Sequence, residues 1–194
     1  MTVYAAHPWR NNAELIVACH ELGYIRHEHR VLDPTYGRGS FWRLWRPSSG
    51  LVFSDLRTDG VDFRALPWPA AAFNAVTFDP PYKLNGTATV AVDDRYGVAE
   101  YASHAARHQL IRDGITECAR VLAPRGCLLV KCQDQVRGGK VRWQTREFAD
   151  HGESLGLELV DMLHILGGRA QPEGRRQVHA RRNFSTMLVL RGPK

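Results

Sequence analysis

RVLDPTYGRGSFWRLW, residues 30–45, is the stretch of the chain that decides the fold. It begins with a short apolar run that is typical of a buried strand, and it ends with aromatic residues that are typical of the first turns of a helix. Between the two, Gly37 and Gly39 let the backbone turn sharply and approach a ligand closely. The stretch therefore predicts a strand, a glycine turn and a helix, the unit from which doubly wound α/β sheets are built.

The same alternation of strands and helices continues on both sides of this stretch. Expected helices cover residues 13–19 (capped by Asn11 or Asn12 and ended by Gly23), 40–45, 101–122 and 145–156. Expected strands cover residues 30–33, 51–55, 61–63, 74–79, 127–131, 157–165 and 184–190. The last two strands have no helix between them, so we expect them to pair antiparallel. This order predicts an α/β, Rossmann-like fold with a doubly wound, mostly parallel seven-stranded sheet and an antiparallel last strand.

Length and composition are those of an ordinary globular chain. The 194 residues suggest one domain, residues 1–194, and 44% of them are hydrophobic. The formal net charge of +6 is a mild bias toward acidic partners such as nucleic acid. We see no signal peptide and no apolar run near the roughly 20 residues that a membrane helix needs, so we expect no membrane span and a cytoplasmic location.

Acidic residues follow several of the expected strands at their carboxyl ends, where ligands bind in open α/β sheets. Asp55 can accept both hydroxyl groups of a ribose, and Asp62 can accept from an adenine amine while Phe63 covers the ring. A dinucleotide-binding motif requires a third small residue where this chain has Trp42, which argues against a nicotinamide or flavin enzyme. His104 and His108 lie four residues apart, and we interpret them as solvated surface residues rather than metal ligands.

The segment Asp79-Pro80-Pro81-Tyr82 directly follows an expected buried strand. Two prolines at such a place fix a rigid turn. The Asp79 carboxylate and the Pro80 carbonyl can together accept the two hydrogens of an exocyclic amine, and Tyr82 offers an aromatic face to a planar base. The alternative is a chance proline turn with a core tyrosine.

Two of these segments resemble those of a known family. Residues 33–40 are similar to the cofactor-binding motif of the amino-group DNA methyltransferases, and residues 79–82 match their catalytic motif. Residues 131–136 and 142–145 resemble those of small stand-alone methylases from phages and their bacterial hosts. The resemblance implies a Rossmann-like class I methyltransferase that uses S-adenosyl-L-methionine and needs no metal. Its implied catalytic residues are Asp79, Pro80, Pro81 and Tyr82. Its implied cofactor-binding residues are Asp33, Pro34, Thr35, Gly37, Gly39, Asp55, Leu56, Asp62 and Phe63.

The chain departs from this family in two respects. The family usually has an aromatic residue where this chain has Thr35, and Tyr36 comes one place late. The chain also has no long target-recognition domain, so recognition must come from loops at 83–97, 134–143 and 167–183. The implied substrate-binding residues in these loops are Lys83, Arg175, Arg176, Arg181 and Arg182. The alternative is that the arginines form a solvated basic loop.

The sequence as a whole thus predicts methyl transfer from S-adenosyl-L-methionine to an exocyclic amine of a nucleic-acid base. The resemblance favours N6 of adenine in DNA. An RNA base N-methyltransferase is one alternative, and a catalytically silent module that binds cofactor and nucleic acid is another. The sequence leaves open whether the protein is a monomer or a homodimer.

Overall fold

The computed structural model describes residues 9–84, 104–167, 178–180 and 182–194. Its strands are β1 (Val31–Asp33), β2 (Leu51–Phe53), β3 (Phe73–Phe78), β4 (Leu122–Cys132), β5 (Gln135–Arg137), β6 (Lys140–Arg142), β7 (Glu158–Leu166) and β8 (Phe184–Arg191). Its helices are α1 (Asn12–Glu21), the 3-10 turn η1 (Ser40–Trp42), α3 (His104–Val121) and α4 (Gln144–Ser154). Among the described residues, no helix is long and apolar enough to cross a membrane.

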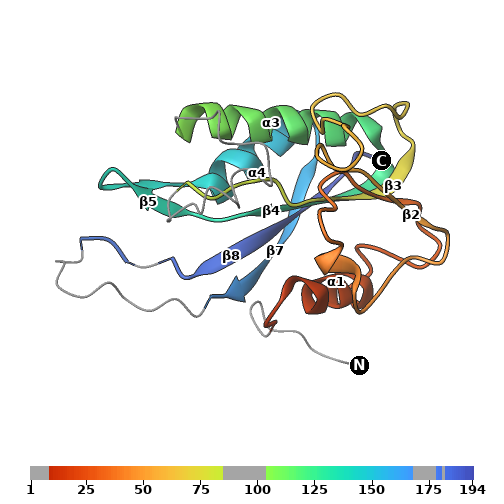
Figure 1. Ribbon diagram of the computed structural model, residues 1–194, viewed down its shortest axis with the longest axis horizontal. Helices are drawn as coiled ribbons and strands as arrows, with labels where there is room; N and C mark the ends of the chain where they lie inside the picture. The colour runs from red at the N-terminus through yellow and green to blue at the C-terminus, as the bar shows by residue number, and fades with distance from the viewer. Residues whose placement is uncertain (1–8, 85–103, 168–177, 181) are drawn as a thin grey trace.

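One sheet forms the centre of the molecule, with the strand order β2-β1-β3-β4-β8-β7 (Figure 1). Strands β2, β1, β3 and β4 pair parallel, whereas β8 pairs antiparallel with both β4 and β7. The predicted doubly wound, mostly parallel sheet with an antiparallel last strand is therefore confirmed. Strands β5 and β6 form a separate antiparallel hairpin within the segment 134–143 that was expected to be a loop.

The predicted strand at 61–63 is wrong, so the sheet has six strands in the described part of the chain rather than seven. The backbone turns there because the Asp62 side chain accepts the Arg64 N–H at 2.8 Å, and the Asp62 carbonyl accepts the Ala65 N–H at 2.9 Å. Such local hydrogen bonds compete with the bonds of a sheet. Phe63 is buried against Phe78, with the two ring centroids 5.0 Å apart.

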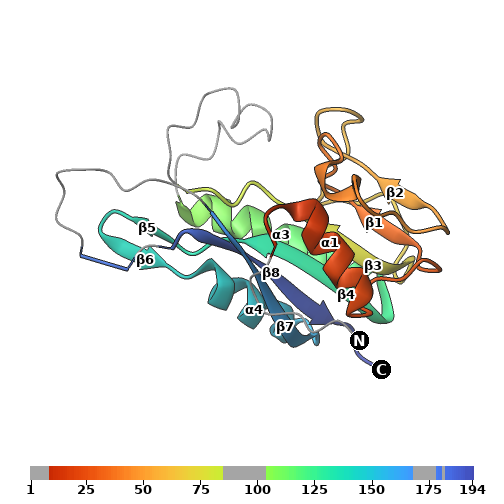
Figure 2. The same cartoon turned by 90° about the horizontal axis from the view of Figure 1, so that it is seen from below.

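Helices cover both faces of the sheet, as Figures 1 and 2 show from two directions. Helices α3 and α4 lie on one face and bury residues such as Ile111 and Phe148 there. Helix α1 and the turn η1 lie on the other face and bury residues such as Leu15 and Phe41. Successive residues of β4 alternate between the two hydrophobic clusters because side chains of a strand point to opposite faces in turn.

The ends of α1 are those that the sequence predicts. The Asn11 side chain accepts the N–H groups of Ala13 and Glu14, so Asn11 is the cap. Gly23 follows the helix with a φ of +81°, a conformation that favours glycine. The helix expected at 40–45 is shorter than predicted, a single 3-10 turn over Ser40–Trp42, in which the Trp42 side chain is buried.

Candidate active site

A pocket of about 400 Å³ lies beyond the carboxyl ends of β1, β2 and β3, and its size is typical of small-molecule sites. Five of the residues that the sequence predicts line it: Asp33, Thr35, Gly37, Asp55 and Asp79. These residues come from three strand ends because parallel neighbours end at the same edge of a sheet. We call this the rim pocket.

The glycine turn forms one wall of the rim pocket. Gly37 and Gly39 have φ values of +54° and +67°, which other residues rarely adopt. A Cβ atom on Gly39 would lie 2.5 Å from the Tyr36 hydroxyl, so a side chain there would displace the tyrosine. Tyr36 itself lines the pocket and stacks on Phe53, with ring centroids 4.2 Å apart. The Gly37 N–H donates to the Asp55 carboxylate at 3.0 Å, which ties the turn to the end of β2.

Asp33 lies beneath the pocket and is 4% exposed. Its carboxylate accepts the Trp42 Nε1–H at 2.6 Å and the Thr35 N–H at 3.0 Å. Burial raises the pKa of Asp33 to about 7, and the hydrogen bonds from Trp42 and Thr35 partly counteract that effect. Trp42 thus orients the Asp33 carboxylate at the end of β1. In the sequence this residue served only as evidence against a dinucleotide site.

Asp79 faces the same pocket from the end of β3. Its N–H donates to Thr35 Oγ1 at 2.8 Å, so the glycine-turn segment also fixes the start of the Asp79-Pro80 turn. The Oδ1 atom is buried, and no group in the described part of the chain donates a hydrogen bond to it. Burial raises the pKa of Asp79 to about 6, although Lys131 and Lys83 act to lower it. A buried acceptor without a donor is rare in folded proteins and is typical of a site that receives a ligand.

Lys131 is a buried cation near Asp79 that sequence reasoning missed. It is 1% exposed, and its Nζ donates to Asn12 Oδ1 at 2.9 Å. Burial lowers the pKa of Lys131 to about 8, while the Asp79 carboxylate acts to raise it. The signal in the sequence is a lysine at the end of the apolar run 127–131. A lysine in a central strand is costly unless a nearby carboxylate compensates for its charge.

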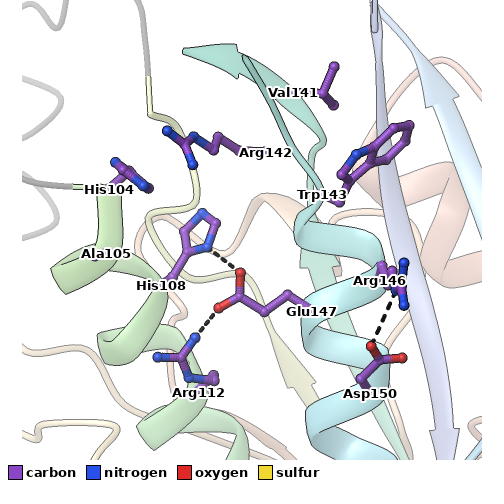
Figure 3. Close-up of a pocket in the computed structure, with 10 residues that line it drawn as sticks. All are labelled: His104, Ala105, His108, Arg112, Val141, Arg142, Trp143, Arg146, Glu147 and Asp150. Carbon is purple, nitrogen blue, oxygen red and sulfur yellow. Dashed lines mark hydrogen bonds and ion pairs between the residues drawn. The ribbon is translucent and has the colours of Figure 1, made fainter. Parts of the chain in front are cut away.

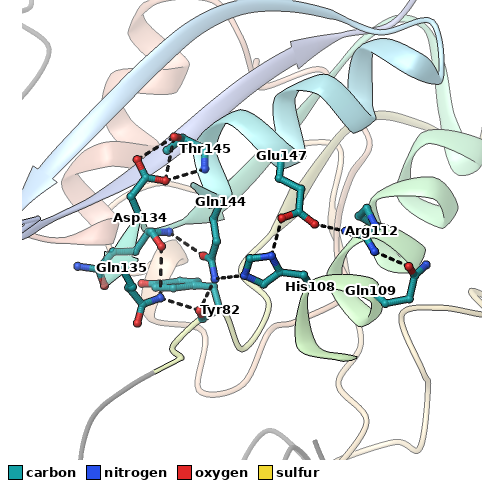
Figure 4. Close-up of polar contacts among 10 residues, drawn as sticks. Tyr82, His108, Gln109, Arg112, Asp134, Gln135, Gln144, Thr145 and Glu147 are labelled. Carbon is teal, nitrogen blue, oxygen red and sulfur yellow. Dashed lines mark hydrogen bonds and ion pairs between the residues drawn. The ribbon is translucent and has the colours of Figure 1, made fainter. Parts of the chain in front are cut away.

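The residues after the two prolines are clamped by side chains from β5 and α4 (Figure 4). Gln144 and Gln135 both donate from Nε2 to the Tyr82 carbonyl, at 2.7 and 2.9 Å. Gln135 Oε1 accepts the Leu84 N–H at 2.9 Å. The Pro80 carbonyl accepts the Tyr82 N–H at 2.7 Å and keeps a second lone pair for another donor. Tyr82 is half-buried against the core cluster under α3.

Five of the predicted cofactor-binding residues do not line the rim pocket: Pro34, Gly39, Leu56, Asp62 and Phe63. Asp62 forms an ion pair with Arg64 at 2.5 Å, and hydrogen bonds from Arg64 hold the pKa of Asp62 below its usual range. Phe63 is part of the hydrophobic core. Pro34 is buried, and Leu56 is 44% exposed.

The predicted substrate-binding residues are described only in part. Lys83 is exposed and lies directly after Tyr82. The Arg182 guanidinium lies over the Trp143 ring, 4.1 Å from its centroid. His179 Nε2 bonds to the Gly139 carbonyl at 2.8 Å, so the turn between β5 and β6 contacts the described part of the segment 167–183. The remaining predicted substrate-binding residues, Arg175, Arg176 and Arg181, lie outside the described residues.

The interpretation of His104 and His108 as solvated residues is wrong for His108. Its side chain is buried between α3 and α4, and its Nδ1 lies 2.5 Å from a carboxylate oxygen of Glu147. The helical spacing placed His108 on the buried stripe of α3, but its partner is 39 residues away in the chain. Within the described ranges, no group of three or more His, Cys, Asp and Glu side chains has the arrangement of a metal site.

No family model matches the sequence, and no curated protein matches it. Solved structures do match the fold. The N-methyltransferase NodS from Bradyrhizobium japonicum has a TM-score of 0.57 at 12% identity, over 94% of each chain. A protein from Bacillus halodurans assigned as a methyltransferase has a TM-score of 0.55 at 12% identity, over 92% of this chain and 99% of its own. These two likenesses show that this chain has the α/β, Rossmann-like fold of the methyltransferases.

A third structure is that of a Thermus thermophilus protein assigned as a DNA modification methylase, in complex with S-adenosyl-L-methionine. It is 16% identical, with a TM-score of 0.49, and the match covers 85% of this chain. The present chain spans little more than half of that methylase, 56% of its length. A shared fold hosts many reactions, so the chemistry must be argued from the site itself.

Proposed function

We propose that this protein is a methyltransferase that uses S-adenosyl-L-methionine and methylates an exocyclic amine of a nucleic-acid base, N6 of adenine in DNA. The observation that carries the proposal is the Asp79 carboxylate. Its Oδ1 is a buried acceptor without a donor in the described chain, at the edge of the rim pocket. An exocyclic amine supplies the N–H that this acceptor lacks.

The residues of the rim pocket fit the cofactor. The glycine turn presents backbone to a ligand, and the close approach of Tyr36 to Gly39 excludes a side chain there. Asp55 uses its carboxylate for the Gly37 and Arg57 N–H groups, and a carboxylate has about four acceptor positions, so two remain for ribose hydroxyls. When bound, S-adenosyl-L-methionine supplies a methyl group on a positively charged sulfur. We assign Gly37, Gly39 and Asp55 to holding it.

The acceptors of the Asp79-Pro80 turn prepare the amine for attack. The lone pair of a base amine is delocalised into the ring, which makes the nitrogen a poor nucleophile. Hydrogen bonds to Asp79 and to the free lone pair of the Pro80 carbonyl favour a pyramidal nitrogen whose lone pair points out of the ring plane. A carboxylate with a pKa near 6 is also a competent acceptor for the proton that the amine releases.

A nucleic-acid base is the substrate that best suits the surroundings of this acceptor pair. Tyr82 follows the two prolines and is half-buried, and we assign its ring to stacking on the base. In a duplex the base must leave the helix, at a cost of a few kcal/mol that stacking partly offsets. The preference for adenine in DNA rests on the resemblance of residues 79–82 to the amino-group DNA methyltransferases. RNA is the alternative substrate.

The test is expression in a host that lacks DNA methylation, followed by mass spectrometry of nucleosides from its DNA and RNA. We expect N6-methyladenine in DNA from the wild-type protein and none from Asp79→Ala, while the control Asp113→Ala on the exposed side of α3 methylates normally. Isothermal titration with S-adenosyl-L-methionine should show binding to all three proteins. Binding without any methylated nucleoside would support the silent module and overturn the proposed activity.

A further inference from the structure

A second pocket, of about 470 Å³, lies between the N-terminal turns of α3 and α4 and strand β6, apart from the rim pocket (Figure 3). Arginines from all three elements line it: Arg112, Arg142 and Arg146. Its carboxylates are Glu147 and Asp150. We call it the basic pocket. Its volume is in the range of sites that hold a molecule the size of a nucleotide.

Both carboxylates of the basic pocket are already paired. Glu147 contacts Arg112 and the buried His108, and Asp150 lies 3.5 Å from Arg146. Arg142 has no such partner among the described residues, and its Nε is buried without an acceptor. A buried guanidinium N–H without an acceptor is costly, so the site favours an anionic ligand that supplies one.

The pocket also has an aromatic edge. Trp143 is 49% exposed, and the Arg182 guanidinium covers its ring at 4.1 Å from the centroid. A tryptophan that carries an arginine on its ring and remains half exposed is suited to stack on a base. Arg142, with its unpartnered Nε, and the half-exposed Trp143 are adjacent in the chain.

Hydrogen bonds connect the basic pocket to Tyr82, in the segment 79–82 (Figure 4). Gln144, the residue after Trp143, donates from Nε2 to the Tyr82 carbonyl at 2.7 Å and to His108 Nε2 at 3.3 Å. The other ring nitrogen of His108, Nδ1, lies 2.5 Å from the Glu147 carboxylate. The wall of the basic pocket and the backbone that presents Tyr82 are therefore parts of one network.

We propose that the basic pocket binds the nucleotide that flanks the target base in the same strand, with its phosphate on Arg142 and its base stacked on Trp143. The proposal rests on the proposed function and adds to it a place where this chain holds its substrate. Gln144 follows Trp143 and is hydrogen-bonded to the Tyr82 carbonyl. A nucleotide in the basic pocket would therefore lie close to the segment 79–82, which receives the target base.

Binding of a fluorescent single-stranded DNA oligonucleotide tests this proposal without relying on turnover. Arg142→Met is compared with Arg26→Met, a control at an exposed arginine outside both pockets. We expect Arg142→Met to raise the Kd roughly tenfold and to lower the slope of log K against log salt by about 0.7, the share of one phosphate contact. The control should match the wild type in both. Unchanged affinity and slope in Arg142→Met would overturn the proposal.

Trp143 supplies the second measurement. Trp143→Ala should weaken oligonucleotide binding by roughly tenfold, and Trp143→Phe should restore most of it because phenylalanine still stacks. An RNA oligonucleotide of the same sequence shows whether the pocket discriminates between the two polymers. Equal competition by an acidic peptide of matched charge would overturn the assignment to a nucleotide.

These outcomes are separate from those of the proposed function. Titration with S-adenosyl-L-methionine should be unchanged in the Arg142 and Trp143 variants, because neither residue lines the rim pocket. If Arg142→Met binds DNA normally while the wild type methylates adenine, the pocket assignment is wrong and the function stands. If no nucleoside is methylated, the function itself fails.

Discussion

Replacing Lys131 with methionine tests whether the buried cation keeps Asp79 ionised. Methionine has a similar length and no charge, so it fills the space and removes the ammonium group whose charge lowers the pKa of Asp79. Burial already raises the pKa of Asp79 to about 6, and Lys131 lowers it more than Lys83 does. Without Lys131 the pKa of Asp79 must rise further, since the charged carboxylate loses its favourable partner.

The size of the effect follows from the ionised fraction of Asp79. With a pKa of about 6, roughly nine-tenths of the carboxylates are ionised at pH 7. A rise of about one unit, the low end of what a neighbouring charge causes, reduces that fraction to roughly one-half, and a rise of two units reduces it to roughly one-tenth. If the ionised form accepts the amine, methyl transfer at pH 7 falls by about twofold to tenfold and recovers at pH 9.

The assay is transfer of a labelled methyl group from S-adenosyl-L-methionine to DNA between pH 5 and pH 9, expressed as kcat/KM. The wild type should lose activity below pH 6, and in Lys131→Met this acid limb should move to higher pH. Lys194→Met, at an exposed position, is the matched control. Damage to the fold would lower activity at every pH. Loss of the Lys131 charge lowers activity only where Asp79 is protonated, so activity recovers as the pH is raised. An acid limb at the same pH in Lys131→Met and wild type refutes the reasoning.

Three further predictions concern the walls of the rim pocket. Trp42→Phe removes the hydrogen bond to Asp33 and should lower the free energy of unfolding by about 2–3 kcal/mol at pH 8, measured by urea denaturation; an unchanged midpoint would contradict the role given to Trp42. In the wild type the raised pKa of Asp33 means that the folded state binds this proton more tightly, so the group stabilises the fold below about pH 4 and that contribution is lost as the pH rises to about 7. A urea series from pH 4 to pH 8 in which this contribution does not decline would refute that sign. Gly39→Ala should weaken S-adenosyl-L-methionine binding at least tenfold by titration, because its Cβ meets Tyr36, whereas Gly60→Ala, equally strained in φ but with open space around it, should bind normally.

The sequence predicted the positions that depend on strand ends. Asp33, Asp55 and Asp79 line one pocket because parallel strands bring their carboxyl ends together, and the alternation of strands and helices already indicated parallel pairing. The antiparallel pairing of the last two strands followed from the missing helix between them. These parts of the fold follow from short-range patterns.

Two of the features that the sequence did not predict depend on contacts between distant residues. Gln135 and Gln144 clamp the Tyr82 carbonyl from 53 and 62 positions away, and no local pattern marks an amide for that task. His108 was assigned to solvent because its partner Glu147 lies on another helix. The strand at 61–63 failed for a local reason, since the Asp62 side chain takes the Arg64 N–H that a strand would have needed.

The position of β8 has a consequence for how the chain acquires its structure. Strand β8 lies between β4 and β7, both of which precede it in the sequence. Until residues 184–191 have been synthesised and paired, β4 has an open edge and β7 has no neighbour in the sheet. Both strands then present unpaired backbone N–H and C=O groups to other chains. Because β4 also supports β3, the strand that precedes Asp79, closure of the sheet requires residues 184–191 and depends on contacts of long sequence separation. The sheet is thus most exposed to aggregation just before β8 is inserted between β4 and β7.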